Sequence, residues 1–363
     1  MKVATILGAR PQFIKASVVS AALDNDSRCE EIIIHTGQHF DANMSEIFFS
    51  ELGIKTPDYN LEIHSGNHGA MTGRMLIAIE DVLLKEKPDV VLVYGDTNST
   101  LAGALAATKL HIPVAHVEAG LRSFNMHMPE EINRILTDRI SAWLFTPTAD
   151  AVKHLQNEGF TEERISHVGD VMYDVALHYG KRSELRDNTA LSRLSLNKNK
   201  FILMTVHRAE NTDNAERFKK IILGLCEVAK SIKVVWPLHP RALNALKREG
   251  LYEHANKHLH LVEPLGYLDM IELEKNAAVI ATDSGGVQKE AFFHGTPCIT
   301  LRDETEWNEL VAAGWNRLIM LNDSSVEEIA DYILSSVDTK GLAVKPYGNG
   351  NASELIVKRI MGQ

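Results

Sequence analysis

The chain has 363 residues, with 38 lysines and arginines against 48 aspartates and glutamates, and 45% of its residues are hydrophobic. That length exceeds one ordinary core and predicts two domains, while the apolar content excludes a disordered chain. A formal net charge of −10 without a cluster of basic residues argues against a nucleic-acid partner, because phosphate binding needs a basic stripe.

Three features of the sequence bear on where the protein works. Its first residues, MKVATILGARPQ, pass from a strand into a polar loop, where a signal peptide would stay apolar. No apolar run approaches the roughly 20 residues of a membrane span. Cys29, Cys226 and Cys298 lie far apart, in or beside apolar segments. We therefore expect a cytoplasmic protein with no membrane partner, whose cysteines are packing residues.

Short apolar, β-branched runs alternate with helical patterns along the whole chain. In the first half they are VATIL from Val3, EIIIHT from Glu31, VVLVYG from Val90, VAHVEA from Val114, WLF from Trp143 and ISHV from Ile165. In the second half they are FILMTVH from Phe201, KVVWPLH from Lys233, LHLVEP from Leu259, AAVIATD from Ala277, PCITLRD from Pro297 and RLIML from Arg317. This alternation predicts an α/β fold with two Rossmann-like domains, whose parallel sheets face a central cleft.

The polar stretch from Gly180 to Lys200 marks the domain boundary. We place the N-terminal domain at 1–180 and the C-terminal domain at 181–345. Residues 346–363 carry apolar side chains at helical spacing, which predicts one short closing helix. Ligands of doubly wound sheets bind beyond the carboxyl ends of the strands, so the loops at the strand ends should carry the function.

The first such loop, GARPQFIKA from Gly8, argues against common nucleotide cofactors. It lacks the G-x-G-x-x-G spacing of dinucleotide sites, and no Walker A motif occurs in the chain, so we expect neither nicotinamide chemistry nor ATP hydrolysis. Arg10 and Lys15 place two cations beside a helix N-terminus, which suits a phosphate or a developing oxyanion, although surface cations would look the same.

The segment ATDSGGVQKEA predicts a diphosphate site. A buried strand ends at Asp283, and a helix follows Ser284, Gly285 and Gly286, so that free backbone amides would face an anion. Glu290, further along that helix, is placed to accept hydrogen bonds from a ribose diol. The alternative is a plain helix cap with packing glycines.

Carboxylates gather where strands of the first half stop: Asp96 in VYGDTNST, Glu118 in AHVEAGLRS and Glu130 in MPEEINR. Buried acids of this kind are caps, ion pairs or proton-transfer groups. We expect the helix from Pro129 to carry Glu130, Arg134 and Asp138 on one face, with Arg134 orienting Glu130. Its buried stripe is predicted to contain Ile132, Ile135, Leu136, Ile140 and Trp143.

Histidines follow strand ends in the second half. His207 and Arg208 lie in TVHRAEN, and His239 lies in WPLHP. The one H-x-H pair, His258 and His260, has no third ligand at a recognisable spacing, and no HExxH motif occurs, so we expect no metal ion.

Together these motifs resemble the UDP-N-acetylglucosamine 2-epimerase family. The motifs that carry the resemblance are GARPQFIKA, YGDTNST, HVEAGLRS, MPEEINR, TVHRAEN, TDSGGVQKEA and PYGNGNASE, in this order. The resemblance covers essentially the whole chain. It implies the GT-B architecture, with the C-terminal helix returning to the N-terminal domain, and C2 epimerisation of a UDP-sugar by anti elimination of UDP to a 2-acetamidoglycal and re-addition, without a cofactor.

The same resemblance implies roles for individual residues. The catalytic positions would be Asp96, Glu118, Glu130 and His207, with His207 near the leaving group. The substrate would be held by Arg10, Lys15, Arg134, Arg122, His239, Ser284, Gly285, Gly286, Glu290 and Arg302. Removing a C2 proton needs a carboxylate base, and a leaving diphosphate needs cations and helix amides.

The chain departs from the family pattern in two places. The sequence TEWNE has Trp307 where the family commonly has arginine in TERPE, and with GWNRL from Gly314 it resembles the branch acting on UDP-2,3-diacetamido-2,3-dideoxyglucuronate. We expect Arg122 and His127 to face the added carboxylate. At the allosteric UDP-sugar site, Gln38 and Arg74 have counterparts, but Asp41 replaces a common glutamine, which argues against that regulation.

The product would belong to bacterial surface polysaccharide synthesis (O-antigen or capsule), and we expect a homodimer. A hydrolysing 2-epimerase, a GT-B glycosyltransferase and a nucleotide-sugar sensor without turnover remain open as alternatives.

Overall fold

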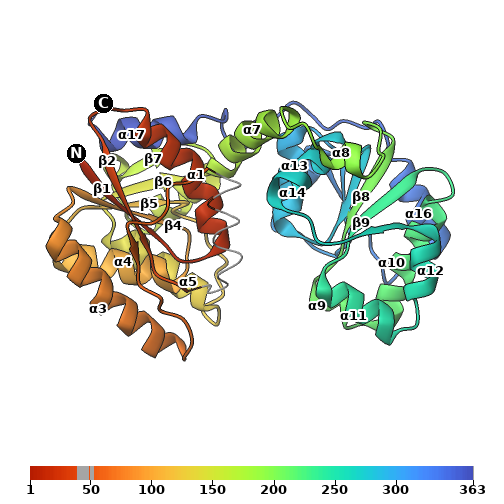
Figure 1. The fold of residues 1–363 in the computed structure, drawn as a ribbon, viewed down its shortest axis with the longest axis horizontal. Helices are drawn as coiled ribbons and strands as arrows, with labels where there is room; N and C mark the ends of the chain where they lie inside the picture. The colour runs from red at the N-terminus through yellow and green to blue at the C-terminus, as the bar shows by residue number, and fades with distance from the viewer. Residues whose placement is uncertain (39–48, 50–52, 363) are drawn as a thin grey trace. The chain divides into compact units, whose positions relative to one another are not determined.

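The computed structural model describes residues 1–38, 49 and 53–362. The chain forms two compact units (Figure 1), Met1–Val175 with Lys345–Gln363, and Ala176–Val344. The divisions therefore fall at 175/176 and 344/345, where the sequence placed them at 180/181 and 345/346. Among the helices that the structure describes, none combines the length and apolar character needed to cross a membrane.

Unit 1 is built on a parallel sheet in the order β3-β2-β1-β4-β5-β6-β7. Its strands are β1 (Lys2–Leu7), β2 (Glu30–His35), β3 (Tyr59–Asn60), β4 (Val90–Tyr94), β5 (Val114–Val117), β6 (Trp143–Thr146) and β7 (Ile165–His167). All six strands predicted for this half are present, and the short edge strand β3 is an addition. The strand order reverses between β1 and β4, so a ligand site is expected at their carboxyl ends.

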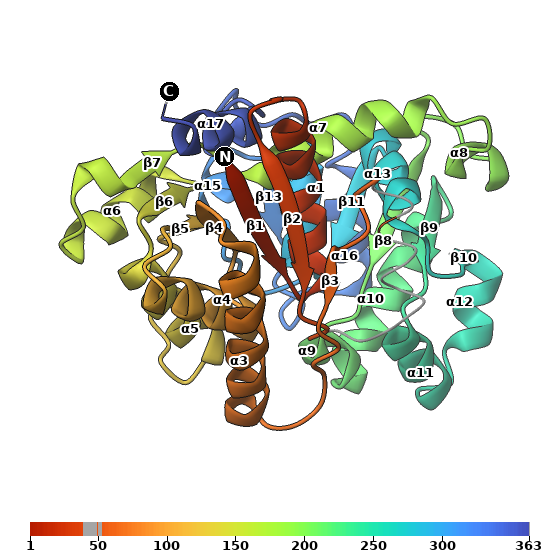
Figure 2. The ribbon, with the colours of Figure 1, turned by 60° about the vertical axis from the view of Figure 1, so that its left-hand side comes forward.

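Helices cover both faces of this sheet. They are α1 (Arg10–Asp24), α3 (His68–Glu86), α4 (Asn98–Lys109), α5 (Pro129–Ile140), α6 (Ala149–Asn157), the 3-10 turn η1 (Glu162–Arg164), α7 (Val171–Glu184) and α17 (Ala352–Ile360). Helix α17 packs on α1, and both chain ends lie near it (Figures 1 and 2). Asp174 accepts hydrogen bonds from the first amides of α17, Ala352 N at 3.1 Å and Ser353 N at 2.8 Å, which fixes the C-terminal helix on unit 1.

Unit 2 repeats the plan with a parallel sheet in the order β10-β9-β8-β11-β12-β13. Its strands are β8 (Phe201–Thr205), β9 (Lys233–Pro237), β10 (His260–Val262), β11 (Val279–Thr282), β12 (Cys298–Thr300) and β13 (Asn316–Leu318). Its helices, with α7 entering from unit 1, are α8 (Ala190–Arg193), α9 (Ala209–Thr212), α10 (Ala215–Val228), α11 (Pro240–Arg248), α12 (Tyr252–His258), α13 (Tyr267–Asn276), α14 (Gly285–His294), α15 (Asn308–Ala312) and α16 (Val326–Leu334). One core, around Phe218 and Trp236, lies under α10 and α16, and a second, around Phe201 and Leu273, lies under α13 and α14. The predicted α/β fold with two Rossmann-like domains is confirmed.

Helix α5 does not bury the predicted stripe. Ile132 and Leu136 are 41% and 46% exposed, whereas Glu131, Asn133, Thr137 and Asp138 are the buried residues of the helix. The prediction failed because the buried Glu131 and Asp138 are paired with arginines and loop amides, which offsets the cost of burying them. The periodicity identified the helix but assigned its inner face wrongly.

Candidate active site

The loop after β1 lies against the loop after β4 because glycine and glutamine allow a close approach. A Cβ atom on Gly8 would lie 2.0 Å from Ser99 Oγ, so only glycine fits there. Gln12, which sequence reasoning did not single out, accepts from Gly8 N at 2.8 Å and donates to Tyr94 O at 2.7 Å. This amide therefore joins the two loops at the switch point of unit 1.

Glu118 and Lys15 form an ion pair at this edge of unit 1. Glu118 has φ 73°, a left-handed conformation that side chains rarely adopt, and such strain is concentrated at functional sites. Gly95 is left-handed as well (φ 63°), and a Cβ there would lie 3.3 Å from Glu118 Oε2 and 3.8 Å from Lys15 Nζ. Gly95 thus leaves room for a mostly buried carboxylate–ammonium pair.

Asp96, the next residue, holds a second ion pair. Its Oδ2 lies 2.5 Å from Arg134 Nη2 on α5, and the other Arg134 nitrogen contacts Glu131. Glu131 is buried and also accepts from Ser123 N and Phe124 N, both at 2.9 Å. Burial alone would raise the pKa of Glu131, but these hydrogen bonds hold the pKa below its usual value.

The expectation that Arg134 orients Glu130 is therefore corrected. Its partners are Asp96 and Glu131, because Glu131 is the residue of the PEE sequence that faces the loop after β5. Glu130 is exposed in the first turn of α5, and Arg10 is exposed at the start of α1. Of the predicted residues in unit 1, the structure brings together Lys15, Asp96, Glu118 and Arg134.

Arg122 occupies a buried cluster with Asp138 and Glu158. Its Nη1 lies 2.7 Å from Asp138 Oδ2, and its Nε lies 2.6 Å from Glu158 Oε1. Asp138 also bonds His116 Nδ1 at 2.7 Å, and His116 Nε2 donates to Gly95 O at 2.7 Å. Burial opposes the charge of Arg122, but Glu158 and Asp138 raise the pKa of its guanidinium above its ordinary value. This geometry supports a structural role for Arg122 and argues against the predicted contact with a substrate carboxylate, while His127 is exposed.

In unit 2, the fully buried Asp283 organises the loop after β8. Its carboxylate accepts from His207 N at 3.1 Å, Arg208 N at 3.0 Å and Asn211 Nδ2 at 3.0 Å. The His207 ring reaches the same carboxylate, with Nδ1 3.5 Å from Oδ1. The acid at the end of β11 thereby fixes the backbone and the ring that follow β8.

His239 packs beside His207, with ring centroids 5.4 Å apart. Its Nδ1 accepts from Arg241 N at 3.1 Å and caps α11, so its remaining proton lies on Nε2. Burial, together with the nearby His207 and Arg241, lowers the pKa of His239. A neutral His239 can donate one hydrogen bond to a ligand.

Helix α14 begins directly at the glycines of the predicted diphosphate loop. Within the described residues, the Ser284 hydroxyl makes no capping hydrogen bond to this helix. Trp307 donates its indole N–H to Gly285 O at 2.8 Å, and Lys289 Nζ lies 4.5 Å from the centre of the Trp307 ring. A Cβ on Gly285 would lie 3.5 Å from Arg208 Nη2, so the Arg208 guanidinium lies beside the helix N-terminus. Arg208 was not among the predicted site residues. Helix amides and this cation can bind a diphosphate.

Two further predicted residues are held by neighbours. Glu290 accepts from Tyr267 OH at 3.1 Å, and burial together with the charge of Glu290 raises the pKa of Glu274. Arg302 is buried, with Nε 3.0 Å from Glu210 and Nη1 2.9 Å from Glu306. These contacts raise the pKa of Arg302 against the effect of burial. The structure thus supports a positioning role for Arg302.

The residues of the predicted allosteric site are partly described. Gln38 accepts from Ser99 N at 3.0 Å, and Arg74 donates to Ser65 O at 2.5 Å. Gly286, a predicted diphosphate residue and not part of that site, is exposed in the first turn of α14. Asp41 lies outside the described residues.

Comparisons with known proteins agree with this geometry. The model of the UDP-N-acetylglucosamine 2-epimerase family matches residues 21–361. Over 363 residues the chain is 55% identical to the UDP-2,3-diacetamido-2,3-dideoxy-D-glucuronate 2-epimerase of Pseudomonas aeruginosa, with 99% of each chain covered. The structure of UDP-GlcNAc 2-epimerase from Methanocaldococcus jannaschii is similar with a TM-score of 0.91 and 46% identity, covering 100% of both chains. Its complex with UDP-GlcNAc and UDP gives a TM-score of 0.82 and 47% identity, with the same coverage.

Proposed function

Since the chain belongs to the UDP-N-acetylglucosamine 2-epimerase family and is a UDP-sugar 2-epimerase, we propose that it converts UDP-2,3-diacetamido-2,3-dideoxyglucuronate to its manno epimer. The name of the relative at 55% identity and Trp307 at the phosphate loop support this substrate. In bacteria, such a product would feed surface polysaccharide synthesis.

The observation that carries the mechanism is the pair of carboxylates at the switch point of unit 1. Glu118, in its strained conformation beside Lys15, and Asp96, held by Arg134, supply a base and an acid within one loop edge. We propose that a carboxylate takes the C2 proton while the C1–O bond breaks and UDP leaves with its electron pair. UDP then adds back to the glycal, and C2 is protonated on the other face. We retain Glu130 as a proposed catalytic residue only because it matches the family motif MPEEINR.

We propose that unit 2 binds the nucleotide. The amides at the start of α14, the Ser284 hydroxyl and Arg208 would hold the diphosphate, and Glu290 the ribose. His207, fixed by Asp283 and neighboured by His239, would stabilise the leaving phosphate. The complex of the Methanocaldococcus jannaschii enzyme with UDP-GlcNAc and UDP supports this class of ligand.

We also propose a cytoplasmic homodimer. The three cysteines are free thiols, as is usual in a reducing compartment. Exposed apolar side chains on α3 and α5, which both pack against α4, offer a surface for a second copy.

One NMR experiment tests the reaction. Incubation with the diacetamido-uronate in D2O should yield a UDP-linked epimer with deuterium at C2, because the abstracted proton exchanges with solvent before it returns. Release of free sugar and UDP would indicate a hydrolysing enzyme. Absence of any reaction without an added acceptor would indicate a transferase. Retained protium at C2 contradicts elimination and re-addition. A clear preference for UDP-N-acetylglucosamine as substrate contradicts the branch assignment.

A further inference from the structure

Two helices of unit 2 bring one thiol and two imidazoles together. Cys226 lies on α10, and His254 and His258 lie on α12 at i and i+4, the spacing that puts two side chains on one helix face. Their possible ligand atoms, one from each residue, all lie within 4.8 Å of one another. The H-x-H pattern in the sequence joins His258 to His260, and His260 is not a member of this cluster.

The cluster is arranged for donation of lone pairs. His258 Nδ1 lies 2.9 Å from the backbone oxygen of His254, which can only accept, so the ring carries its proton on Nδ1 and Nε2 keeps a free lone pair. A backbone carbonyl in this position is the usual partner that orients a metal-binding histidine. Cys226 is 4% exposed, while both histidines are exposed and can adjust their rings.

We propose that Cys226, His254 and His258 bind a divalent zinc-class metal ion. In a tetrahedral zinc site, ligand atoms are separated by about 3.4–3.6 Å, as Zn–S and Zn–N bonds of about 2.3 and 2.0 Å require, so rotation of the exposed rings would bring the three ligand atoms onto one ion. Binding releases the thiol proton of Cys226 to solvent, and a water molecule takes the fourth position.

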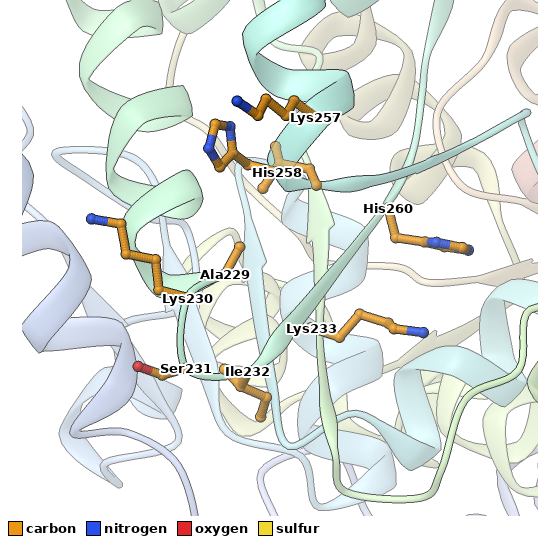
Figure 3. A pocket seen from close by; sticks show the side chains of 9 residues that line it. Ala229, Lys230, Ser231, Ile232, Lys233, Lys257, His258 and His260 are labelled. Carbon is orange, nitrogen blue, oxygen red and sulfur yellow. The ribbon is translucent and has the colours of Figure 1, made fainter.

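The donor set and its surroundings select the kind of ion. Thiolate and imidazole suit zinc and cobalt, whereas magnesium and calcium need oxygen ligands, which these three side chains do not supply. Lys230, Lys233 and Lys257 line the pocket beside His258 (Figure 3) and weigh against weakly held hard cations. Glu227, next to Cys226, lies 2.6 Å from Lys230 and offsets one of these charges.

The site is separate from the candidate active site. His258 and His260 stand at the amino end of β10, while His207 and Asp283 follow the carboxyl ends of β8 and β11. A metal ion would therefore join α10 to α12 without touching the reacting sugar. We assign it a stabilising role in unit 2.

Cobalt titration of the metal-free full-length protein tests the proposal. We expect a thiolate-to-cobalt absorption band in the near ultraviolet and a visible band of tetrahedral cobalt, both removed by added zinc. Cys226→Ser should abolish the near-ultraviolet band. His254→Gln, at an exposed position, should weaken cobalt affinity about tenfold or more and remove the zinc-dependent rise in unfolding temperature. His260→Gln, from the same pocket, is the matched control and should behave as wild type.

Absence of the near-ultraviolet band in the wild type overturns the proposal. So does persistence of that band in Cys226→Ser, or wild-type cobalt affinity in His254→Gln.

Discussion

At the residue scale, the candidate chemistry of unit 1 depends on pairs of opposite charge. Glu118 contacts Lys15, and Asp96 contacts Arg134, so each carboxylate is mostly removed from water without an uncompensated charge. The cation beside each carboxylate fixes its position. A carboxylate base prepared in this way needs little reorganisation when the substrate arrives.

We expect Glu118→Gln and Asp96→Asn each to lower kcat by about 10²- to 10⁴-fold or more while UDP affinity stays near wild type. General acid and base groups contribute this much, and UDP is bound by unit 2 in the proposed function. Turnover followed by NMR and calorimetric UDP binding check this. Asp187→Asn, at an exposed position of unit 2, is the matched control, and near-normal turnover by both site variants would sink the assignment.

Gly95 gives a second prediction. Gly95→Ala should lower kcat by about tenfold or more, because its Cβ would lie 3.3 Å from Glu118 Oε2 in addition to the strain of a positive φ. Gly159→Ala is matched in φ (82°) but has open space beside it among the described residues. Both variants should lose about 1 kcal/mol of stability, measured by urea unfolding. Equal kcat values in the two variants would contradict the close approach of Gly95 and Glu118.

At the scale of elements, helix α14 and strand β2 differ in what their polar groups do. The start of α14, where we propose that the diphosphate binds, has Arg208 and Trp307 at its side. Strand β2 instead buries a carboxyl group, Glu31, against Thr5 and Ser20 of unit 1. The first arrangement serves binding, and the second makes stability depend on pH.

For α14 we expect Ser284→Ala to weaken UDP binding about 2- to 10-fold, since one hydroxyl contributes roughly 0.5–1.5 kcal/mol. Gly285→Val should weaken it much more. A Cβ at residue 285 fits at ordinary contact distance, but the branched methyls would enter the space before Arg208 and Trp307. Calorimetry with UDP decides, and wild-type affinity in Gly285→Val would rule out this helix terminus as the diphosphate site.

For β2, burial raises the pKa of Glu31 to about 7 from its ordinary 4.5, and its Oε2 has no partner among the described residues. The folded state therefore binds the proton more tightly, and the free energy of unfolding falls as pH rises from about 4.5 to 7. Between pH 5 and 8, Glu31→Gln should gain on the order of 2 kcal/mol relative to wild type. Urea unfolding at both pH values measures it. The exposed neighbour Glu30→Gln is the control, and equal pH dependence of Glu31→Gln and wild type would contradict the shift.

At the scale of the whole molecule, exposed apolar side chains on α3 and α5 bear on assembly. Ile77 and Leu84 on α3 are 64% and 55% exposed, and Ile132 and Leu136 on α5 add further apolar area. Helix α5 can face outward with apolar residues because its polar side is occupied by the ion pairs of the candidate site. The inward-facing polar side of α5 thus explains why the apolar stripe is exposed, and that exposed stripe is the surface of the proposed dimer.

We expect light scattering to give the mass of a dimer for the wild type and of a monomer for the double variant Ile132→Asp with Leu136→Asp, since two carboxylates in an apolar interface cannot be desolvated cheaply. Leu185→Asp, at an 85% exposed position in unit 2, is the control and should remain dimeric. A monomeric wild type, or a double variant that keeps the mass of a dimer, would exclude this surface.

The sequence by itself determined the architecture and the edges that hold the site. Buried parallel strands occur as apolar β-branched runs, and strand-end loops such as those at Gly8, Asp96 and Ser284 follow from them, because the apolar pattern of each strand lies in consecutive residues. Tertiary structure alone decided which charges meet. That Arg134 pairs with Asp96, that Arg122 is buried with Asp138 and Glu158, and that Cys226 lies near His254 depends on contacts between different elements. Side-chain pairing is set by packing at close range, and one turn of helix changes which neighbour a side chain can reach.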